Sequence, residues 1–348
     1  MKRIYCIIFL VLPFLWQVES QTPPKNRIEV AKQFSNPLLP SGADPWTIYK
    51  DGFYYYTSTS GNRLEIRKTK SLADLRSAER KVIWRPPAGT NYSKEIWAPE
   101  LHFLRGKWYM YFAADDGNNN NHRMYVVENT SEDPMIGDWV FKGKVADETD
   151  KWAIDGTVFE HKNQLYMLWS GWEGDKNGQQ NIYIAKMSNP WTISSERQLL
   201  SSPELEWEKV GSFKDPYVSV NEGPQILMNN SKIFLIYSAS GCWTDSYNLG
   251  MLTFNGKDDL LNSKAWTKNK TSVFGKSEQN GVFAPGHNSF FKSKDGKEDW
   301  ILYHANDNPG QGCSNFRSPR AQRFTWNKDG TPNFGLPVSV KQQLQEPN

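Results

Sequence analysis

Four acidic residues and one histidine stand out, because each lies near the start of a short strand-like segment that leads into a polar turn. They are Asp44, Glu100, Asp155, Glu222 and His287. A single acid beside glycine or proline is most often an ordinary turn or cap residue. Five polar residues at the same place in five similar segments instead indicate charges gathered in one site. Such gathering costs stability and is usually kept for catalysis or metal binding.

Carboxylates that face each other across a pocket suit the hydrolysis of a glycosidic bond. One carboxylic acid protonates the leaving oxygen, while the other attacks the anomeric carbon or activates a water molecule. A third acid nearby can raise the pKa of the proton donor and keep it protonated at neutral pH. The residue types support this chemistry but do not assign the roles.

The elements that must position these residues form a fivefold internal repeat. A polar turn followed by a short apolar strand occurs five times, and the strands begin at Phe53, Trp108, Leu165, Ile233 and Trp300. Each is followed by a loop and a further strand-like run, so each repeat predicts about four antiparallel strands. Four-stranded units repeated radially are typical of an all-β fold, here a five-bladed β-propeller. A β-sandwich is the alternative, but it does not require the same order five times.

In a propeller the first strand of each blade lines the central channel, so residues at the start of those strands converge near one axis. We therefore expect the four acids and the histidine to lie together. The chain contains 15 Trp, 15 Tyr and 18 Phe, an enrichment that suits both β-rich cores and surfaces that stack on sugar rings. Residues 21–348 are predicted to form a single catalytic domain.

The first twenty residues have the pattern of a signal peptide. Basic Lys2 and Arg3 precede an apolar stretch, which ends before small residues of the type that a signal peptidase recognises. A membrane anchor is the alternative, but the apolar run is shorter than the ~20 residues that a spanning helix needs. The sequence thus predicts residues 1–20 as a signal peptide, export to the periplasm or the extracellular space, and no membrane span.

Charge and cysteine content narrow the partners. The formal net charge of +3 in 348 residues has no strong sign, so neither nucleic acid nor an anionic membrane is indicated as a partner. Cys6 lies in the predicted signal peptide, and Cys242 and Cys313 remain. These two cysteines form either a disulfide or two separate free thiols, since spacing alone does not decide. The oligomeric state is not predicted.

Five motifs resemble those of glycoside hydrolase family 43, in the same order along nearly the whole predicted mature chain. They are Gly42–Trp46, Trp97–Glu100, Ala153–Thr157, Asn221–Pro224 and Gly286–Phe290. The resemblance implies a five-bladed propeller and hydrolysis with inversion at the anomeric carbon. It agrees with the architecture indicated by the repeat.

The resemblance also implies separate roles for three acids. Asp44 matches the general base that activates water, Glu222 the general acid, and Asp155 the residue that orients Glu222 and tunes its pKa. His287 matches an axial histidine that in some family members helps to hold Ca²⁺ or Na⁺ through waters. One histidine without a carboxylate cluster is a poor site for a hard cation, so a histidine without metal is the alternative. No cofactor is expected for the chemistry.

Four further residues are predicted to bind substrate. Arg320 resembles a family arginine that points into the sugar pocket, and its alternative is a surface salt bridge. Trp46 and Trp97 are candidates for an apolar floor under the sugar ring, or for core packing. Glu100 is the fourth predicted substrate ligand, because it shares the repeat position of the other acids.

The motifs Ile96–His102, His122–Val126 and Pro285–Phe290 look most like the exported arabinofuranosidase branch of the family. By this analogy we expect exo release of terminal α-L-arabinofuranose from plant polysaccharides or oligosaccharides. A β-xylosidase, an endo-arabinanase and a galactan-degrading enzyme of the same family are alternatives, because the fold does not choose among them. A non-catalytic carbohydrate-binding propeller is the alternative from another class, and the three intact acids argue against it.

Overall fold

The computed structural model describes Met1, residues 32–214 and residues 217–347. Apart from Met1, the predicted signal peptide of residues 1–20 therefore lies outside the described residues. The elements belong to one compact unit, Lys32–Asn348. No helix in the described residues is long and apolar enough to cross a membrane.

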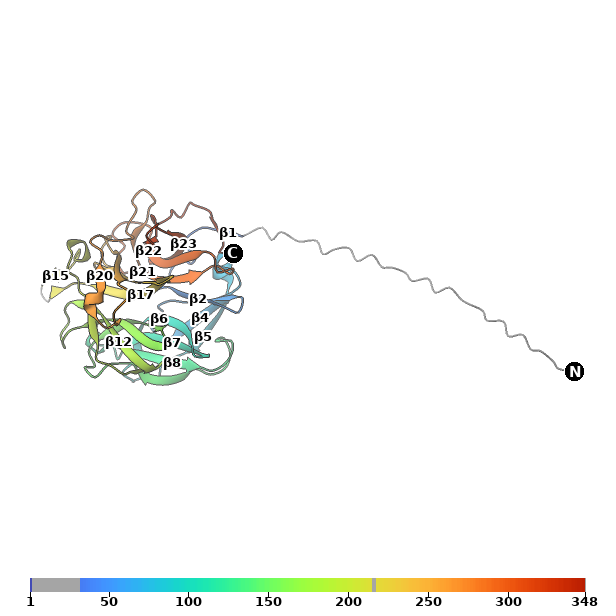
Figure 1. Cartoon of the computed structure of the whole chain (residues 1–348), viewed down its shortest axis with the longest axis horizontal. Coiled ribbons are helices and arrows are strands. Elements are labelled where there is room, and N and C mark those ends of the chain that lie inside the picture. The colour runs from blue at the N-terminus through green and yellow to red at the C-terminus, as the bar shows by residue number, and fades with distance from the viewer. Residues whose placement is uncertain (2–31, 215–216, 348) are drawn as a thin grey trace. The chain divides into compact units, whose positions relative to one another are not determined.

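Five antiparallel sheets repeat along this unit and form the blades of a β-propeller (Figure 1). Blade I contains β2 Trp46–Lys50, β3 Phe53–Thr57, β4 Leu64–Thr69 and β5 Glu79–Trp84. Blade II contains β6 Lys94–Leu104, β7 Lys107–Asp115, β8 Arg123–Asn129 and β9 Val140–Lys144. Blade III contains β10 Ala153–His161, β11 Gln164–Trp172 and β12 Gln180–Asn189, with β13 Thr192–Ile193 and β14 Gln198–Ser201 both paired to β12.

Blade IV contains β17 Asn221–Asn229, β18 Lys232–Ala239, β19 Asn248–Phe254 and β20 Trp266–Lys268. Blade V contains β21 Phe283–Lys292, β22 Asp299–Asn306, β23 Ser318–Trp326 and β24 Pro332–Asn333. Two short pairs lie outside the blades: β1 Gln33–Phe34 with β25 Leu344–Gln345, and β15 Phe213–Lys214 with β16 Tyr217–Val218. Within the described ranges, four short 3₁₀ helices lie in loops: η1 Leu72–Ser77, η2 Asn119–Asn121, η3 Glu206–Glu208 and η4 Ser263–Ala265. The prediction of an all-β, five-bladed propeller is confirmed.

The predicted polar turns are two-residue hairpin loops in four blades. In blade I, Lys50 pairs with Phe53, and the loop residues Asp51 and Gly52 have φ of 51° and 84°. Positive φ at both loop positions is what the tight hairpin turn requires, because its twist matches that of the flanking strands. The short polar turn therefore fixes the register between the first two strands of the blade.

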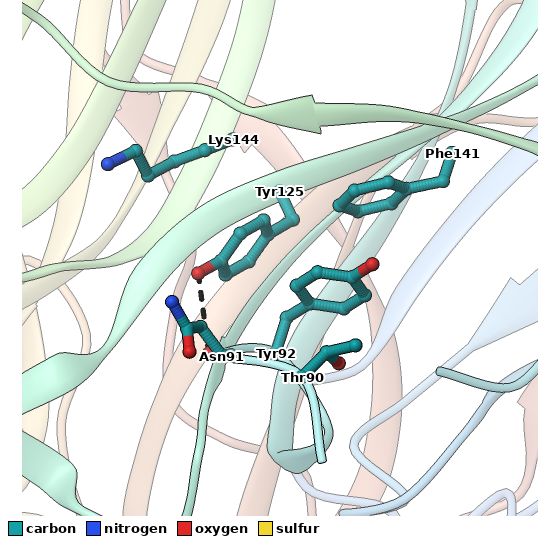
Figure 2. A pocket seen from close by; sticks show the side chains of 6 residues that line it. All are labelled: Thr90, Asn91, Tyr92, Tyr125, Phe141 and Lys144. Carbon is teal, nitrogen blue, oxygen red and sulfur yellow. Dashed lines mark hydrogen bonds between the residues drawn. The ribbon is translucent and has the colours of Figure 1, made fainter. Parts of the chain in front are cut away.

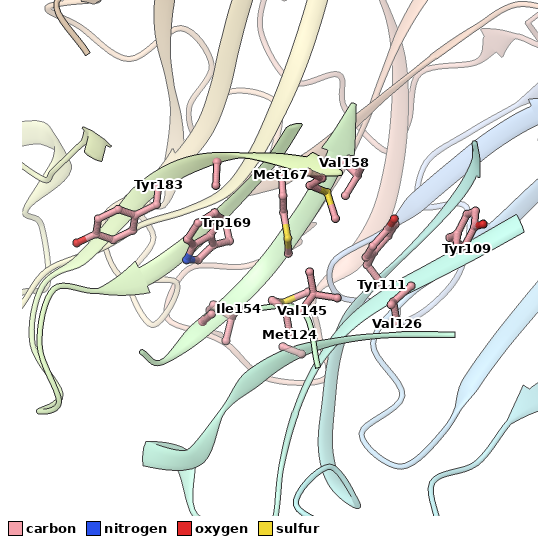
Figure 3. Packing of buried hydrophobic residues seen from close by; sticks show 14 of the residues in the cluster. Tyr109, Tyr111, Met124, Val126, Val145, Ile154, Val158, Met167, Trp169 and Tyr183 are labelled. Atoms are coloured by element: carbon pink, nitrogen blue, oxygen red, sulfur yellow. The ribbon is translucent and has the colours of Figure 1, made fainter. Parts of the chain in front are cut away.

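The hydrophobic core consists of clusters between neighbouring blades. Figure 3 shows the cluster between blades II and III, where Met124 and Met167 pack with Tyr111 and Trp169. Corresponding clusters join blades I and II, III and IV, and IV and V. A fifth cluster combines residues of blades I and V with Phe34 of β1, so the packing closes into a ring.

The first strand of blades II to V carries a β-bulge at the same place. The register shifts there, so that two residues oppose one residue of the second strand. The first bulged residues are Ala98, Asp155, Gly223 and His287, all with positive φ, and Asp44 just before β2 also has a φ of 56°. Backbone strain of this kind is typically retained at functional sites.

This register corrects the equivalence expected from the repeat. Glu222 lies one residue before the bulge position of its blade, and Glu100 lies two residues after it. In blade II the equivalent position is occupied by Ala98, whose methyl group offers no chemistry. The sequence did not show the bulges, so it placed Glu100 and Glu222 in the same row as the others.

Candidate active site

A cavity of about 520 Å³ lies where the first strands of the blades meet. Its volume is in the range of ordinary small-ligand sites. Its charged and titratable lining residues are Asp44, Asp155, Glu222, His287 and Arg317. The remaining lining includes four aromatic rings, those of Trp97, Trp152, Phe213 and Trp243. Blades I, III, IV and V thus each contribute charge to one pocket, as expected for Asp44, Asp155, Glu222 and His287.

Asp44 is held as a carboxylate by several donors. The Thr59 hydroxyl donates to Oδ2 at 2.6 Å, and Arg317 Nη1 lies 3.4 Å from Oδ1. Nδ1 of His287 is 3.3 Å from Oδ1. Burial alone would raise the pKa of Asp44, but the charges of His287 and Arg317 outweigh it and hold the pKa well below its ordinary value. Asp44 is therefore ionised over the acidic and neutral range.

Asp155, which is buried, and Glu222, which is partly exposed, form an acidic pair of the opposite character. Burial is the largest influence on both groups and raises both pKa values, that of Asp155 to about 7. The negative charge of Glu222 also raises the pKa of Asp155, while His287 and the Gly223 N–H, which donates to Asp155 Oδ2 at 3.0 Å, oppose this increase. Below about pH 7 the pair therefore holds a proton that it can deliver.

Tyr247 was not singled out in the sequence, yet it contacts Glu222 directly. Its hydroxyl donates to Glu222 Oε1 at 2.7 Å, and this hydrogen bond lowers the pKa of Glu222 against the effect of burial. The ring stacks on His304 with centroids 5.7 Å apart, and a Cβ on Gly286 would come within 2.2 Å of it. The glycine of the predicted motif thus makes room for the tyrosine that positions Glu222.

His287 lies among the carboxylates. Its Nδ1 is 3.3 Å from Asp44 Oδ1 and 3.9 Å from Asp155 Oδ2. Burial lowers its pKa, but the surrounding acids outweigh burial and raise it. The surrounding acids therefore favour the protonated imidazole between the two aspartates.

No group of three or more His, Cys, Asp or Glu side chains in the described residues is arranged to hold a metal ion. Because His287 Nδ1 faces Asp44 and Asp155, the imidazole and these carboxylates neutralise each other. The residues present therefore do not fit a directly coordinated cation, and no step of the proposed chemistry passes through one.

Trp97 is the one predicted aromatic residue that lines the cavity. Its ring stacks on His122 with centroids 4.1 Å apart, and its Nε1 donates to Glu95 Oε2 at 3.0 Å. His122 is itself buried, with Nδ1 3.0 Å from Asp115 Oδ2. Trp97 is therefore fixed from behind and presents part of its ring to the cavity.

The other three residues predicted to bind substrate do not line the cavity. Trp46 donates its Nε1 to the Leu101 carbonyl and packs between blades I and II. Glu100 is buried and pairs with His102 at 2.9 Å, and it accepts a hydrogen bond from Gln225. Arg320 is fully buried and pairs with Asp307. We therefore do not propose these three residues as substrate ligands.

Arg317 occupies the place expected for Arg320. It lies in the loop just before β23, where it can reach Asp44, whereas Arg320 lies inside the strand. The sequence signal was its position at the channel end of the last repeat, next to the start of the third strand. The family resemblance drew attention to Arg320, whereas Arg317 is the arginine that lines the cavity.

Cys242 and Cys313 form a disulfide, with Cα atoms 5.3 Å apart. This settles the two alternatives that the sequence left open. Cys242 lies in the loop between β18 and β19, and Cys313 lies in the loop between β22 and β23. Both cysteines line the cavity, so the bond joins the rims of blades IV and V.

A second hollow of about 440 Å³ lies on blade II and the loop before it (Figure 2). Its rings include Tyr92, Tyr125 and Phe141, and the Tyr125 hydroxyl donates to the Asn91 carbonyl at 3.4 Å. Its six lining residues include no carboxylate. Acid-base hydrolysis is therefore assigned to the first cavity.

Comparison with known protein families agrees with this active-site geometry. The model for glycosyl hydrolases family 43 matches residues 34–332. The chain belongs to glycoside hydrolase family 43. The resemblance inferred from the five motifs is thereby confirmed, and the matched span runs from before the first blade to the start of β24 in the fifth.

Among curated proteins, the family 43 chain is 40% identical over 317 residues to an extracellular exo-α-(1→5)-L-arabinofuranosidase of Streptomyces avermitilis. That match covers 88% of this chain and 64% of the relative, so the chain spans less than two thirds of that protein. A protein of the same name from Streptomyces chartreusis is 38% identical, with 78% of this chain and 82% of the relative covered.

A solved structure titled α-L-arabinofuranosidase from Lactobacillus brevis is also similar. It has a TM-score of 0.82 and 40% sequence identity, and the match covers 89% of this chain and 98% of that one. The similarity therefore extends over nearly the whole of a solved relative.

Proposed function

We propose that this chain is an inverting glycoside hydrolase that releases terminal α-L-arabinofuranose from arabinose-containing plant polysaccharides or oligosaccharides. The observation that carries the proposal is the division of protons among three carboxyl groups in one cavity. Asp44 is held ionised, while Asp155 and Glu222 share an environment that favours the protonated form. A base and an acid with separated pKa values are what acid-base hydrolysis at one centre needs.

In the proposed reaction, Asp44 removes a proton from a water molecule as the water oxygen attacks the anomeric carbon. Glu222 gives its proton to the glycosidic oxygen as the bond from that oxygen to the anomeric carbon breaks. Attack from the face opposite the leaving group inverts the configuration. Asp44 ends protonated and Glu222 ionised, and exchange with solvent restores both groups.

Asp155 and His287 are proposed to adjust the pKa values of Glu222 and Asp44 rather than to take part in the reaction themselves. Asp155 accepts the Gly223 N–H beside Glu222, and its charge state influences the proton on Glu222. His287 supplies positive charge between the aspartates, which favours the ionised base. A cation held near His287 through waters stays a prediction from the family resemblance.

The choice of arabinofuranose rests on the relatives, two of which are named exo-α-(1→5)-L-arabinofuranosidases. The cavity walls by themselves do not distinguish arabinose from xylose. β-Xylosidase, endo-arabinanase and galactan-degrading activities are therefore the outcomes against which the proposal is tested. Export through a signal peptide in residues 1–20, and a mature domain over residues 21–348, remain part of the proposal.

The deciding experiment measures hydrolysis of para-nitrophenyl α-L-arabinofuranoside and para-nitrophenyl β-D-xyloside, followed by the products from linear arabinan, branched arabinan and arabinoxylan. Release of arabinose alone supports the proposal, and arabino-oligosaccharides as first products would establish endo action instead. NMR of the first-formed sugar should show the β-anomer, since inversion of an α-linkage gives β. A first-formed α-anomer would exclude water activation by Asp44. Binding without turnover would favour a carbohydrate-binding propeller.

A further inference from the structure

Two aromatic rings stack at the cavity although both are exposed. Phe213 is 52% and Trp243 37% exposed, and their ring centroids lie 4.9 Å apart at an interplanar angle of 23°. Both rings line the cavity that holds the three carboxyl groups. Large aromatic rings are normally placed in the core, so a stacked pair left open to solvent at a pocket points to a ligand.

The Trp243 ring is held in a fixed orientation. Its Nε1 donates to the Gly211 carbonyl at 2.9 Å. The ring lies so close to Gly241 that a Cβ there would be 2.2 Å from a ring atom, which leaves space only for glycine. The neighbouring Cys242 is bonded to Cys313 of blade V. A ring that is ordered in advance loses little conformational entropy when a ligand binds.

The aromatic pair is on the side of the proposed general acid. Glu222 pairs with Ser238 in blade IV, and Trp243 lies in the next loop of the same blade. Tyr247, near the end of that loop, donates to Glu222. The general acid protonates the leaving oxygen, so the leaving part of the substrate must lie beside Glu222. Asp44, which activates water, comes instead from blade I.

We propose that Phe213 and Trp243 form a binding platform for the glycosyl residues on the leaving-group side of the scissile bond. The ligand class is the neutral furanose or pyranose rings of an oligosaccharide leaving group, whose C–H faces pack on the aromatic faces. This inference rests on the proposed function, because it uses Glu222 as the acid. It goes further in that it predicts preference for oligosaccharides over glycosides with a small leaving group.

The test compares kcat/KM for α-1,5-linked arabinotriose and for methyl α-L-arabinofuranoside, whose leaving group contains no ring. In Trp243→Ala, the loss on arabinotriose should exceed the loss on the methyl glycoside by about tenfold. Trp243→Phe should restore most of the kcat/KM that is lost on arabinotriose. Phe213→Ala should, like Trp243→Ala, lower kcat/KM more on arabinotriose than on the methyl glycoside. Equal losses on the two substrates in both alanine variants would overturn the platform.

A matched control is Tyr92→Ala, which removes a stacked ring from the hollow on blade II. The ratio of the two kcat/KM values should stay at the wild-type value in this variant. A similar change of the ratio in Tyr92→Ala would show that any aromatic loss produces the effect, and would also overturn the proposal.

A binding measurement separates this inference from the proposed function. In Glu222→Gln protein, calorimetry with arabinotriose, xylotriose and α-L-arabinose should show tighter binding of a trisaccharide than of the monosaccharide. Adding Trp243→Ala should weaken the binding of the trisaccharide by about tenfold and the binding of the monosaccharide much less. If the wild-type protein cleaves neither arabinoside, only the proposed sugar is refuted. The platform is then tested by whether Trp243→Ala weakens the binding of whichever trisaccharide binds. If no trisaccharide binds, the platform is refuted.

Discussion

Two buried acidic regions of this propeller differ in how completely their oxygens are satisfied. Glu208, at the end of η3 between blades III and IV, is 0% exposed. Its oxygens accept from Tyr237 at 2.7 Å and from Lys268 at 3.0 Å, and also from Asn221 and two backbone N–H groups. Burial raises the pKa of Glu208, but these donors outweigh it and lower the pKa below its ordinary value.

The pair proposed for acid catalysis has fewer donors, and of the two only Asp155 is fully buried, since Glu222 is partly exposed. Glu222 accepts from Tyr247 and Asp155 from the Gly223 N–H, and both carboxyl groups have raised pKa values. The comparison teaches that burial alone does not decide the protonation of a carboxyl group, since the number of hydrogen bonds to the ionised form decides it too. Glu208 stabilises the fold as an ion, whereas the proposed catalytic pair favours the protonated form.

The largest expected effect separates the two regions by activity. Asp44→Asn and Glu222→Gln should each lower kcat by about 10² to 10⁴, because each removes one proton-transfer step. Glu222→Gln should lower the free energy of unfolding by no more than about 1 kcal/mol, since the amide nearly preserves the volume. Asp44→Asn should cost about 3 kcal/mol, because it leaves His287 and Arg317 without their partner. Steady-state kinetics and urea unfolding measure both quantities. Asp51→Asn in the exposed hairpin turn is the control, and wild-type activity in either catalytic variant would refute the assigned roles.

The next effect reverses this pattern. Glu208→Gln should lower the free energy of unfolding by about 3 kcal/mol, because it leaves the Lys268 ammonium without its buried partner. Residual kcat per folded molecule should stay within a few-fold of wild type. Glu206→Gln on the same 3₁₀ helix is the control, as its side chain is 95% exposed and it should change stability by less than about 0.5 kcal/mol. If Glu208→Gln lowered the free energy of unfolding as little as Glu206→Gln does, Glu208 would not stabilise the fold as an ion.

The pH dependence should differ between the two regions in sign. The Asp155 pKa is raised to about 7, so the folded protein binds this proton more tightly than the unfolded chain between the ordinary pKa and 7. Stability contributed by this group is therefore lost as pH rises towards 7, and kcat/KM should fall above about pH 7. Glu208 has a lowered pKa, so its contribution is lost instead as pH falls below its ordinary value. Activity that stays constant to pH 9 would contradict the shared proton.

The smallest effect concerns single hydrogen bonds. Tyr247→Phe removes the donor that lowers the pKa of Glu222, so the alkaline limb of kcat/KM should move to higher pH. Tyr237→Phe removes the corresponding donor to Glu208, so it should cost about 1 kcal/mol of stability and leave the limb in place. A complete pH profile and urea unfolding of both variants measure this. An alkaline limb at the same pH in both variants would show that Tyr247 does not lower the pKa of Glu222.

Much of the architecture followed from local pattern. Five copies of a turn and strand predicted five blades, because hairpin turns and β-strands depend on neighbouring residues. Asp44, Asp155, Glu222, His287 and Trp97 were predicted near one another, and all five line one cavity. Their proposed roles came from the family resemblance and remain open to the experiments above.

The misses have two physical origins. Glu100 was grouped with the other acids because a one-residue or two-residue offset within a strand leaves no signal in composition, yet it redirects a side chain. Tyr247 and Arg317 were missed because they approach Glu222 and Asp44 from loops distant in sequence. Such contacts depend on how loops of different strands and blades meet.

The sequence by itself determined the repeat, the polar hairpin turns and the presence of three acids near channel strands, since each depends on short stretches of chain. Only the tertiary structure decided which carboxyl group keeps a proton. The pKa values of Asp44 and Glu208 are lowered because several donors and cations surround them, whereas Asp155 and Glu222 accept few hydrogen bonds and have raised pKa values. Protonation in a buried site depends on the number and direction of neighbouring dipoles and charges, and folding alone brings these together.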